Sequence, residues 1–203
     1  MKIVCVGRNY VAHARELGNE VPSDPVIFIK PATALSSPDT PFSIPSFSNE
    51  IHYECELVLR IAKPVRQLKK EETLSCIDAI TAGIDFTARD LQQQLKEKGL
   101  PWEKAKAFDG AAVVGTWMPI DQFPNKKDIH FCLYKNRVIV QQASTAQMIF
   151  DFETLLSHIS MYFTLEHGDL VFTGTPAGVG PVEPGDVLEG FVEDDSAFEL
   201  SIL

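Results

Sequence analysis

Two glutamates separated by one residue, Glu54 and Glu56, are the first side chains in the sequence that could hold a metal ion. They lie in segment 51–60, where polar and apolar residues alternate as in a β-strand with two different faces. Side chains two apart share a face, so the carboxylates are predicted to lie roughly 7 Å apart and to repel one another. A divalent cation would relieve this repulsion, and oxygen ligands favour Mg²⁺, Mn²⁺ or Ca²⁺ over zinc. The ordinary alternative is a solvent-exposed strand face, on which acidic residues are common.

A third carboxylate, Asp85, follows the apolar run 80–84 and precedes a predicted helix. A carboxylate between a strand end and a helix N-terminus is often functional, although it could equally be a structural turn residue. The three acids are therefore candidate ligands of one metal.

The composition limits the classes of protein to consider. The 203 residues carry a formal charge of −10 and are 45% hydrophobic, which suits one domain with a substantial core. A basic stripe for nucleic acid is absent from the sequence, and no run approaches the ~20 apolar residues of a membrane helix. The four cysteines form no C-x-x-C pair, so reduced thiols in a cytoplasmic protein are expected.

The elements that must position these acids are predicted to be mainly strands. Asn9 is expected to cap the first helix, and Thr87 with Asp90 resembles a capping box for the third. Strands outnumber helices without regular alternation, which favours an α+β fold dominated by sheet over a doubly wound one. Strands are predicted at residues 2–6, 26–29, 52–61, 79–86, 129–134, 138–142 and within 169–203, helices at 10–17, 71–76, 88–98 and 152–163, and an extended loop at 30–48.

Six strings spread over nearly the whole chain resemble the fumarylacetoacetate hydrolase family, in particular its short branch of acylpyruvate hydrolases and oxaloacetate decarboxylases. They are G-R-N-Y-x-x-H-x-x-E at 7–16, F-I-K-P at 28–31, H-Y-E-C-E-L at 52–57, D-F-T-A-R-D-L-Q at 85–92, K-x-x-G-L-P-W-x-x-x-K-x-F-D at 96–109 and T-G-T-P-x-G-V-G at 173–180. The resemblance implies a single catalytic domain over 1–203, a rolled mixed β-sheet or barrel with short peripheral helices, a mobile lid at about 7–30, and a homodimer.

The resemblance also implies a role for each matching residue. The metal, Mg²⁺ or Mn²⁺ with Ca²⁺ as a substitute in crystals, would be bound by Glu54, Glu56 and Asp85. The catalytic residues would be His13, Glu16 and Lys106, and the substrate-binding residues would be Arg8, Lys30, Arg89, Gln92 and Thr175.

These roles have independent chemical sense, and each has an ordinary alternative. His13 and Glu16 are three apart on a predicted helix, so they form either a base dyad or a surface pair. Lys106 would stabilise an enolate oxygen, or it is a surface lysine of a charged segment. Arg89 is unfavourable at the start of its helix, which suggests that it serves a ligand carboxylate.

The resulting functional prediction is a Mg²⁺-dependent hydrolase of carbon–carbon bonds in acylpyruvates, with oxaloacetate decarboxylation as a second activity. The alternatives are an isomerase or decarboxylase of the 2-hydroxyhepta-2,4-diene-1,7-dioate type and, from another class, a non-catalytic metal-binding scaffold. The glycines of 173–180 are expected to let the backbone approach the substrate, with Thr175 as a hydroxyl donor. Because protein and substrate are both acidic, Mg²⁺, Lys106 and Arg89 are expected to reverse the charge locally.

Overall fold

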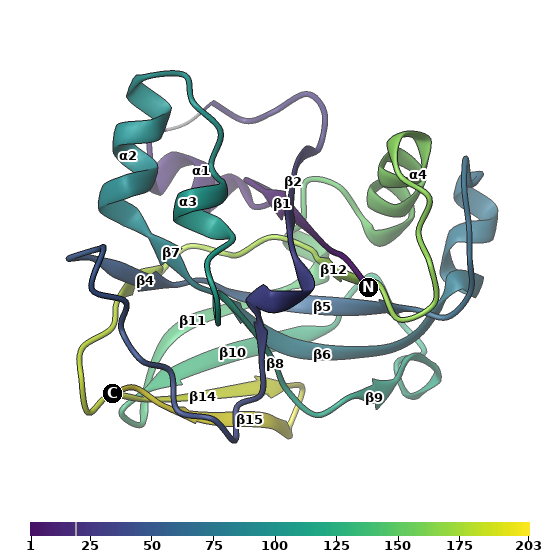
Figure 1. The fold of residues 1–203 in the computed structure, drawn as a ribbon. Helices are drawn as coiled ribbons and strands as arrows, with labels where there is room; N and C mark the ends of the chain where they lie inside the picture. Colours follow the sequence, from purple (N-terminus) through teal and green to yellow (C-terminus); the bar gives the residue numbers. More distant parts are fainter. Residues whose placement is uncertain (19) are drawn as a thin grey trace.

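The fold is built around one long, curled β-sheet in a computed structural model that describes residues 1–18 and 20–203. Two of its contacts, β1 with β12 and β3 with β8, are parallel and the others are antiparallel. Its order is β2 (Val26–Lys30), β1 (Ile3–Gly7), β12 (Leu170–Phe172), β5 (Cys55–Ile61), β6 (Ile77–Asp85), β8 (Ala112–Val114) and β3 (Leu35–Ser36), with β9 (Met118–Pro119) also on β6. Figure 1 shows β5 and β6 crossing the middle of the molecule.

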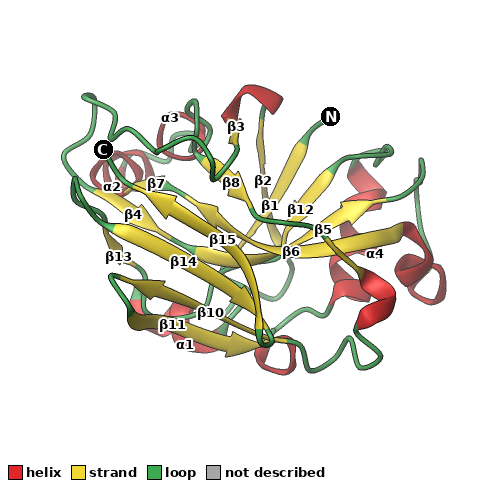
Figure 2. Cartoon of the chain, turned by 90° about the horizontal axis from the view of Figure 1, so that it is seen from below, coloured by secondary structure: helices red, strands yellow, loops and turns green. Residues whose placement is uncertain are grey.

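Two smaller sheets continue the curl, as Figure 2 shows from below. One has the order β11 (Val138–Ser144), β10 (His130–Lys135), β14 (Val187–Val192) and β15 (Asp195–Ser201). The other has the order β13 (Gly180–Pro181), β4 (Ile51–Tyr53) and β7 (Thr87–Ala88). The predicted hairpin at 129–142 is confirmed as β10 and β11. A continuous apolar core, which includes Leu57, Ile84 and Phe131, fills the space within the curl.

The helices are short and lie at the edges of the sheets, which confirms the prediction of a mostly β fold. They are α1 (Val11–Glu16), α2 (Arg89–Glu97), α3 (Glu103–Lys106) and α4 (Phe152–Tyr162), with 3₁₀ turns η1 (Ala32–Ala34), η2 (Lys70–Cys76), η3 (Ile120–Gln122) and η4 (Thr145–Gln147). The helix predicted at 71–76 is therefore a 3₁₀ turn, and the loop predicted at 30–48 contains η1 and β3. None of the helices in the described part of the chain has the length and apolar character needed to cross a membrane.

The strand predicted over 52–61 is in fact two strands that belong to different sheets. The chain leaves β4 at Tyr53 and enters β5 at Cys55, so Glu54 lies at the junction. The paired segment makes the same change of sheet between β6 and β7, and Asp85 is the last residue of β6. The Asp85 amide donates to the Glu54 carbonyl at 2.9 Å. This paired change of sheet brings two of the predicted metal ligands together.

Two predicted helix caps are wrong because tertiary contacts use the same side chains. Asn9 donates to the Phe150 and Thr173 carbonyls and accepts from the Phe150 amide, so it joins three segments and caps nothing. Thr87 lies in β7, and Asp90 accepts from the Ser48 hydroxyl and the Asn49 amide. α2 begins without a side-chain cap.

Candidate metal centre and substrate pocket

Glu54, Glu56 and Asp85 meet at the point where the long sheet changes into the three-stranded one. Each offers a carboxylate oxygen, and these oxygens all lie within 4.8 Å of one another. All three side chains are buried. The E-x-E spacing therefore marks a cluster inside the protein, and the alternative of a solvent-exposed strand face is wrong.

Two lysines neutralise the cluster. Lys106, the last residue of α3, donates to Glu54 Oε2 at 2.7 Å and to Asp85 Oδ2 at 2.8 Å. Lys30, at the end of β2, lies 2.6 Å from Asp85 Oδ1 and donates to the Lys106 and Ala111 carbonyls. Both lysines are buried, so the alternative of Lys106 as a surface residue is also wrong. Their positions come from elements far from the acids in sequence.

The three carboxylates differ in their electrostatic environment. Burial, followed by repulsion from Asp85 and Glu54, raises the pKa of Glu56 well above its ordinary range. Burial also works against ionisation of Glu54, but Lys106 and Arg89 outweigh it and lower the pKa of that carboxyl. Conversely, Asp85 and Glu54 raise the pKa of Lys106 against the effect of its burial. Glu56 is thus the acid with the least compensation from the protein.

The donor set fits a hard divalent cation. Three oxygen ligands leave about three of six octahedral positions for water and substrate. Asp85 Oδ1 is buried and accepts no hydrogen bond, since Lys30 approaches it outside hydrogen-bond geometry. Among the described residues, Glu56 accepts from one group, the Gly174 amide at 2.6 Å. Buried carboxylate oxygens are normally satisfied, so their spare capacity here favours a ligand that the protein does not itself supply.

His13 and Glu16 form the predicted pair on α1. His13 Nδ1 lies 3.1 Å from Glu16 Oε2, and the other Glu16 oxygen accepts from the Gly178 amide at 3.0 Å. His13 is buried and lines the same pocket as the acidic cluster. The contact at Nδ1 leaves Nε2 as the free ring nitrogen. His13 therefore lines the pocket and Glu16 contacts it from behind, an arrangement that is compatible with a base dyad.

Three of the five residues predicted to bind substrate, Arg89, Gln92 and Thr175, are already engaged within the protein. Arg89 donates to Glu54 Oε1 at 2.5 Å and to Gln92 Oε1 at 2.6 Å. Thr175 donates its only hydroxyl proton to the Cys55 carbonyl at 2.8 Å and accepts from Gln141. All three predicted residues line the pocket, but Thr175 has no proton left for a substrate oxygen.

The glycines of the 173–180 loop serve contacts within the protein. Gly174 has φ 103°, and a Cβ there would lie 2.6 Å from the Cβ of Asn9. At Gly178, with φ 98°, a Cβ would lie 2.2 Å from the Val140 carbonyl oxygen. The close approach at these two glycines is to Asn9 and Val140, and their amides donate to Glu56 and Glu16.

The pocket over the cluster is lined by four basic and three acidic side chains. Its empty volume is about 440 Å³, including the mouth, and it contains nine of the eleven predicted site residues. The exceptions are Glu16 and Lys30, which contact His13 and Asp85 from behind the wall. The basic residues are Arg8, Arg89, Lys96 and Lys106. The charge of the protein is thus reversed locally, although it has a formal net charge of −10.

Six lining residues were not predicted from the sequence, and three of them, Phe28, Lys96 and Trp102, have side chains that shape the pocket chemically. Lys96 had a readable signal, because it follows Arg89 and Gln92 at positions i+7 and i+4 on the same helix face. Trp102 packs edge-to-face on Phe28 at 6.0 Å, and the Lys106 ammonium lies 5.2 Å from the centre of the Phe28 ring. Apolar walls of this kind strengthen charge interactions by excluding water.

Comparison with known proteins identifies the family. Residues 2–200 match the fumarylacetoacetate (FAA) hydrolase C-terminal family. This chain belongs to the fumarylacetoacetate hydrolase family. The six strings of the sequence analysis are therefore family motifs, and the curled mixed sheet is the family's fold.

Within the fumarylacetoacetate hydrolase family, close relatives are enzymes of small keto acids. A mitochondrial oxaloacetate tautomerase of Caenorhabditis elegans is 42% identical over 93% of this chain and 88% of its own length. An oxaloacetate decarboxylase of Dictyostelium discoideum is 40% identical over 100% of this chain and 94% of its own. Fumarylpyruvate hydrolase of Pseudomonas aeruginosa, solved with Mn²⁺ and pyruvate, has a TM-score of 0.94 and 35% identity over 100% of this chain and 89% of that one.

Proposed function

We propose that this protein is a divalent-metal-dependent enzyme that interconverts the keto and enol forms of oxaloacetate. The observation that carries the proposal is the buried cluster of three carboxylates beside Lys106 and the His13–Glu16 pair. The oxaloacetate tautomerase at 42% identity supports the substrate, and the Mn²⁺ complex of the fumarylpyruvate hydrolase supports the metal. Mg²⁺ and Mn²⁺ are the proposed cofactors, held by Glu54, Glu56 and Asp85.

The charges of the site suit a substrate with two negative charges. In their ordinary ionised forms, three carboxylates are balanced by Lys30, Lys106 and Arg89. A divalent cation would bring the floor of the pocket to +2 and would supply Lewis-acid stabilisation of an enolate oxygen. An ammonium has three protons, and Lys106 uses two on Glu54 and Asp85. Its third proton would be donated to the substrate.

His13 is the proposed group that moves the proton. In the keto-to-enol direction, its Nε2 would take a proton from C3 while the oxygen gains a proton from water. In the reverse direction, Nε2 would return a proton to C3 while the enol oxygen gives its proton to water. Glu16 would hold the imidazole in the required tautomer through Nδ1, as it does at 3.1 Å. Gly178 fixes Glu16 in turn.

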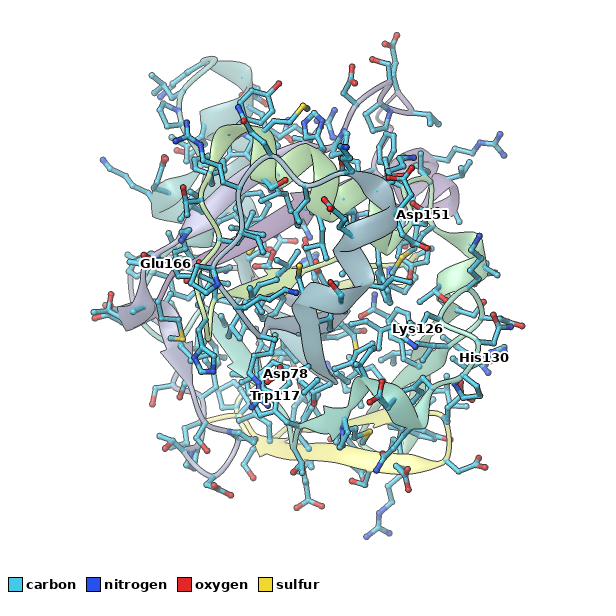
Figure 3. All side chains as sticks on the ribbon, turned by 90° about the vertical axis from the view of Figure 1, so that its right-hand side faces the viewer. Asp78, Trp117, Lys126, His130, Asp151 and Glu166 are labelled. Atoms are coloured by element: carbon cyan, nitrogen blue, oxygen red, sulfur yellow. The ribbon has the colours of Figure 1, made fainter. Side chains whose placement is uncertain are left out.

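The test is the rate at which enol-oxaloacetate converts to its keto form with Mg²⁺ or Mn²⁺. We expect a chelator to abolish the enzymatic rate and the metal to restore it. His13→Gln should lower kcat by about 100-fold or more, the usual contribution of a general base. His130→Gln, an exposed histidine labelled in Figure 3, should leave the rate unchanged. A rate that survives chelation would contradict the proposal.

A second candidate, hydrolysis of acylpyruvates, is favoured by the same His13–Glu16 pair, because hydrolysis needs an activated water. Acetylpyruvate and fumarylpyruvate are the substrates to assay, together with pyruvate release from oxaloacetate as a measure of decarboxylation. His13→Gln should abolish hydrolysis and spare metal binding. Isomerisation of longer dienedioates remains a third candidate. An absence of turnover on all these substrates at several pH values would favour the metal-binding scaffold.

Three predictions about the whole protein remain proposals. We expect a homodimer, a cytoplasmic location and a lid at about 7–30 that closes over the substrate. Four free thiols, among which Cys5, Cys55 and Cys76 are buried, suit a reducing compartment. Sedimentation analysis would test the dimer, and protease protection by oxaloacetate would test the lid.

A further inference from the structure

The mouth of the pocket contains two basic residues, Arg8 and Lys96, that none of the proposed steps uses. Both line the pocket that contains the acidic cluster. The cluster and Lys106 are buried, whereas Arg8 and Lys96 are partly exposed. The pocket therefore has a buried floor, where the metal ligands lie, and a basic outer part. A small substrate would meet both.

The backbone presents these two side chains from separate elements. Lys96 follows Arg89 by seven residues on α2, a rise of about 10 Å at 1.5 Å per residue. Arg8 follows β1 with φ 61°, a left-handed conformation that non-glycine residues seldom adopt and that is often found at functional sites. Within residues 1–18 and 20–203, no carboxylate lies at ion-pair distance from Arg8. Its charge is thus available to a ligand.

The basic residues are also close enough to affect one another. Burial, and then the charges of Arg8 and Arg89, lower the pKa of Lys96. Arg89 is bound to Glu54, so its charge is partly compensated at the floor. An anion placed between Arg8 and Lys96 would relieve the repulsion that these neighbours cause.

We propose that Arg8 and Lys96 form a distal subsite for the second carboxylate of a dicarboxylic 2-oxo acid, and that they select such substrates over monocarboxylic ones. This inference rests on the proposed function for the position of the first carboxylate, at the metal floor. The guanidinium of Arg8 offers two parallel donors, and the ammonium of Lys96 adds a point charge. Both are specificity residues, and neither takes part in proton transfer.

The first experiment compares substrates with one and two carboxylates in Arg8→Gln, Lys96→Gln and the double variant. For oxaloacetate we expect kcat/KM to fall about 10- to 100-fold in each single variant, mainly through KM, because charge-assisted hydrogen bonds are lost. Turnover of monocarboxylic acetylpyruvate should change by less than about 2-fold. Lys98→Gln, an exposed lysine at the end of the same helix, is the matched control. Lys96→Arg should restore the preference for oxaloacetate.

A second experiment does not depend on turnover. Malate and lactate share a 2-hydroxy acid end and differ in the distal carboxylate, so their binding to the Mn²⁺-loaded protein isolates the subsite. By calorimetry, the wild type should bind malate at least about 10-fold more tightly than lactate, and the double variant should bind them equally. An equal loss for both ligands, or an unchanged preference, would overturn the proposal. If oxaloacetate is not turned over but the malate preference depends on Arg8 and Lys96, the proposed reaction fails and the subsite stands.

Discussion

Two groups of buried acids in this protein differ in how fully the protein satisfies their carboxylates. Asp169 and Asp186 each end a turn of the form Glu-x-Gly-Asp, in which the aspartate accepts from the amide of the glutamate three residues earlier, at 2.7 Å. Asp169 also accepts from the Lys2 amide and ammonium, and Asp186 from Asn136, with Lys135 at 2.8 Å. Both aspartates are thus satisfied by an amide of their own turn together with polar groups of another segment.

The metal-ligand candidates have fewer donors and more acids around them. Within residues 1–18 and 20–203, Asp85 Oδ1 has the Lys30 ion pair but accepts no hydrogen bond, and Glu56 accepts one. Hydrogen bonds lower the pKa of Asp169 in spite of its burial, whereas burial and neighbouring acids raise that of Glu56. The difference separates structural acids, whose removal costs stability, from functional acids, whose removal costs binding.

The largest effect is expected for Glu56→Gln. Loss of one ligand should lower activity at least about 100-fold, more than the usual cost of disturbing a group that only orients a ligand. Without metal, the free energy of unfolding should stay equal or rise, because the neutral amide ends the repulsion from Glu54 and Asp85. Urea unfolding in a chelator and oxaloacetate assays measure the two effects. Glu199→Gln, at an exposed strand position, is the control. A large loss of stability in Glu56→Gln would contradict the distinction between structural and functional acids.

Metal binding should stabilise the folded protein through the same residues. At a Mn²⁺ concentration 100 times its Kd, a ligand that binds only the folded state adds about 2.7 kcal/mol. The unfolding temperatures of the wild type and of Asp169→Asn should therefore rise equally with Mn²⁺, while that of Glu56→Gln should rise only slightly. Equal responses in all three proteins would show that the metal binds elsewhere.

Asp169→Asn should lower the free energy of unfolding by about 1.5–3 kcal/mol, the range for hydrogen bonds to charged groups. Its side chain is fully buried, and it ties the start of β1 to the turn before β12. Urea unfolding measures the loss. Activity per folded molecule should match the wild type, and reduced turnover at full saturation would contradict a purely structural role.

Part of the dependence of stability on acid pH should come from the same turns. The folded-state pKa of Asp169 and Asp186 lies below the ordinary value of 3.8, so below about pH 5 the unfolded chain binds more protons than the folded one. Their stabilisation is complete above that range and is lost as the pH falls through it. Between about pH 5 and the acid limit of folding, the unfolding temperature of the Asp169→Asn and Asp186→Asn double variant should fall less steeply than that of the wild type.

The smallest effect is expected at the surface pair of Arg60 and Asp78. Arg60 donates to Asp78 at 2.9 and 3.1 Å and stacks on Trp117 at 5.1 Å, near the labelled Asp78 and Trp117 of Figure 3. Both side chains are 36% exposed, so Asp78→Asn should cost less than about 1 kcal/mol and leave activity unchanged. A cost as large as that of Asp169→Asn would show that exposure does not separate the two kinds of pair.

Much of this molecule was predictable from local patterns. Alternation and turn residues predicted the hairpin of β10 and β11 and the strand of β6, and the motifs predicted the family. Patterns failed where a side chain serves a distant segment. Asn9 has the residue type of a helix cap, but its amide is satisfied by Phe150 and Thr173, more than 140 residues away. The break at Glu54 also has no local signal, because the alternation continues through it.

The sequence by itself determined which acids are the metal-ligand candidates, because Glu54 and Glu56 are two residues apart and Asp85 ends a marked strand. The spacing of Arg89, Gln92 and Lys96 also puts them on one face of α2, a signal that the sequence contains although Lys96 was not predicted from it. Only the tertiary structure decided that Lys30 and Lys106 neutralise the acids, and that Arg8 and Lys96 share a pocket. Such pairings depend on how the sheets join, and the electrostatic energy that sets each charge depends on burial and distance, which no local pattern contains.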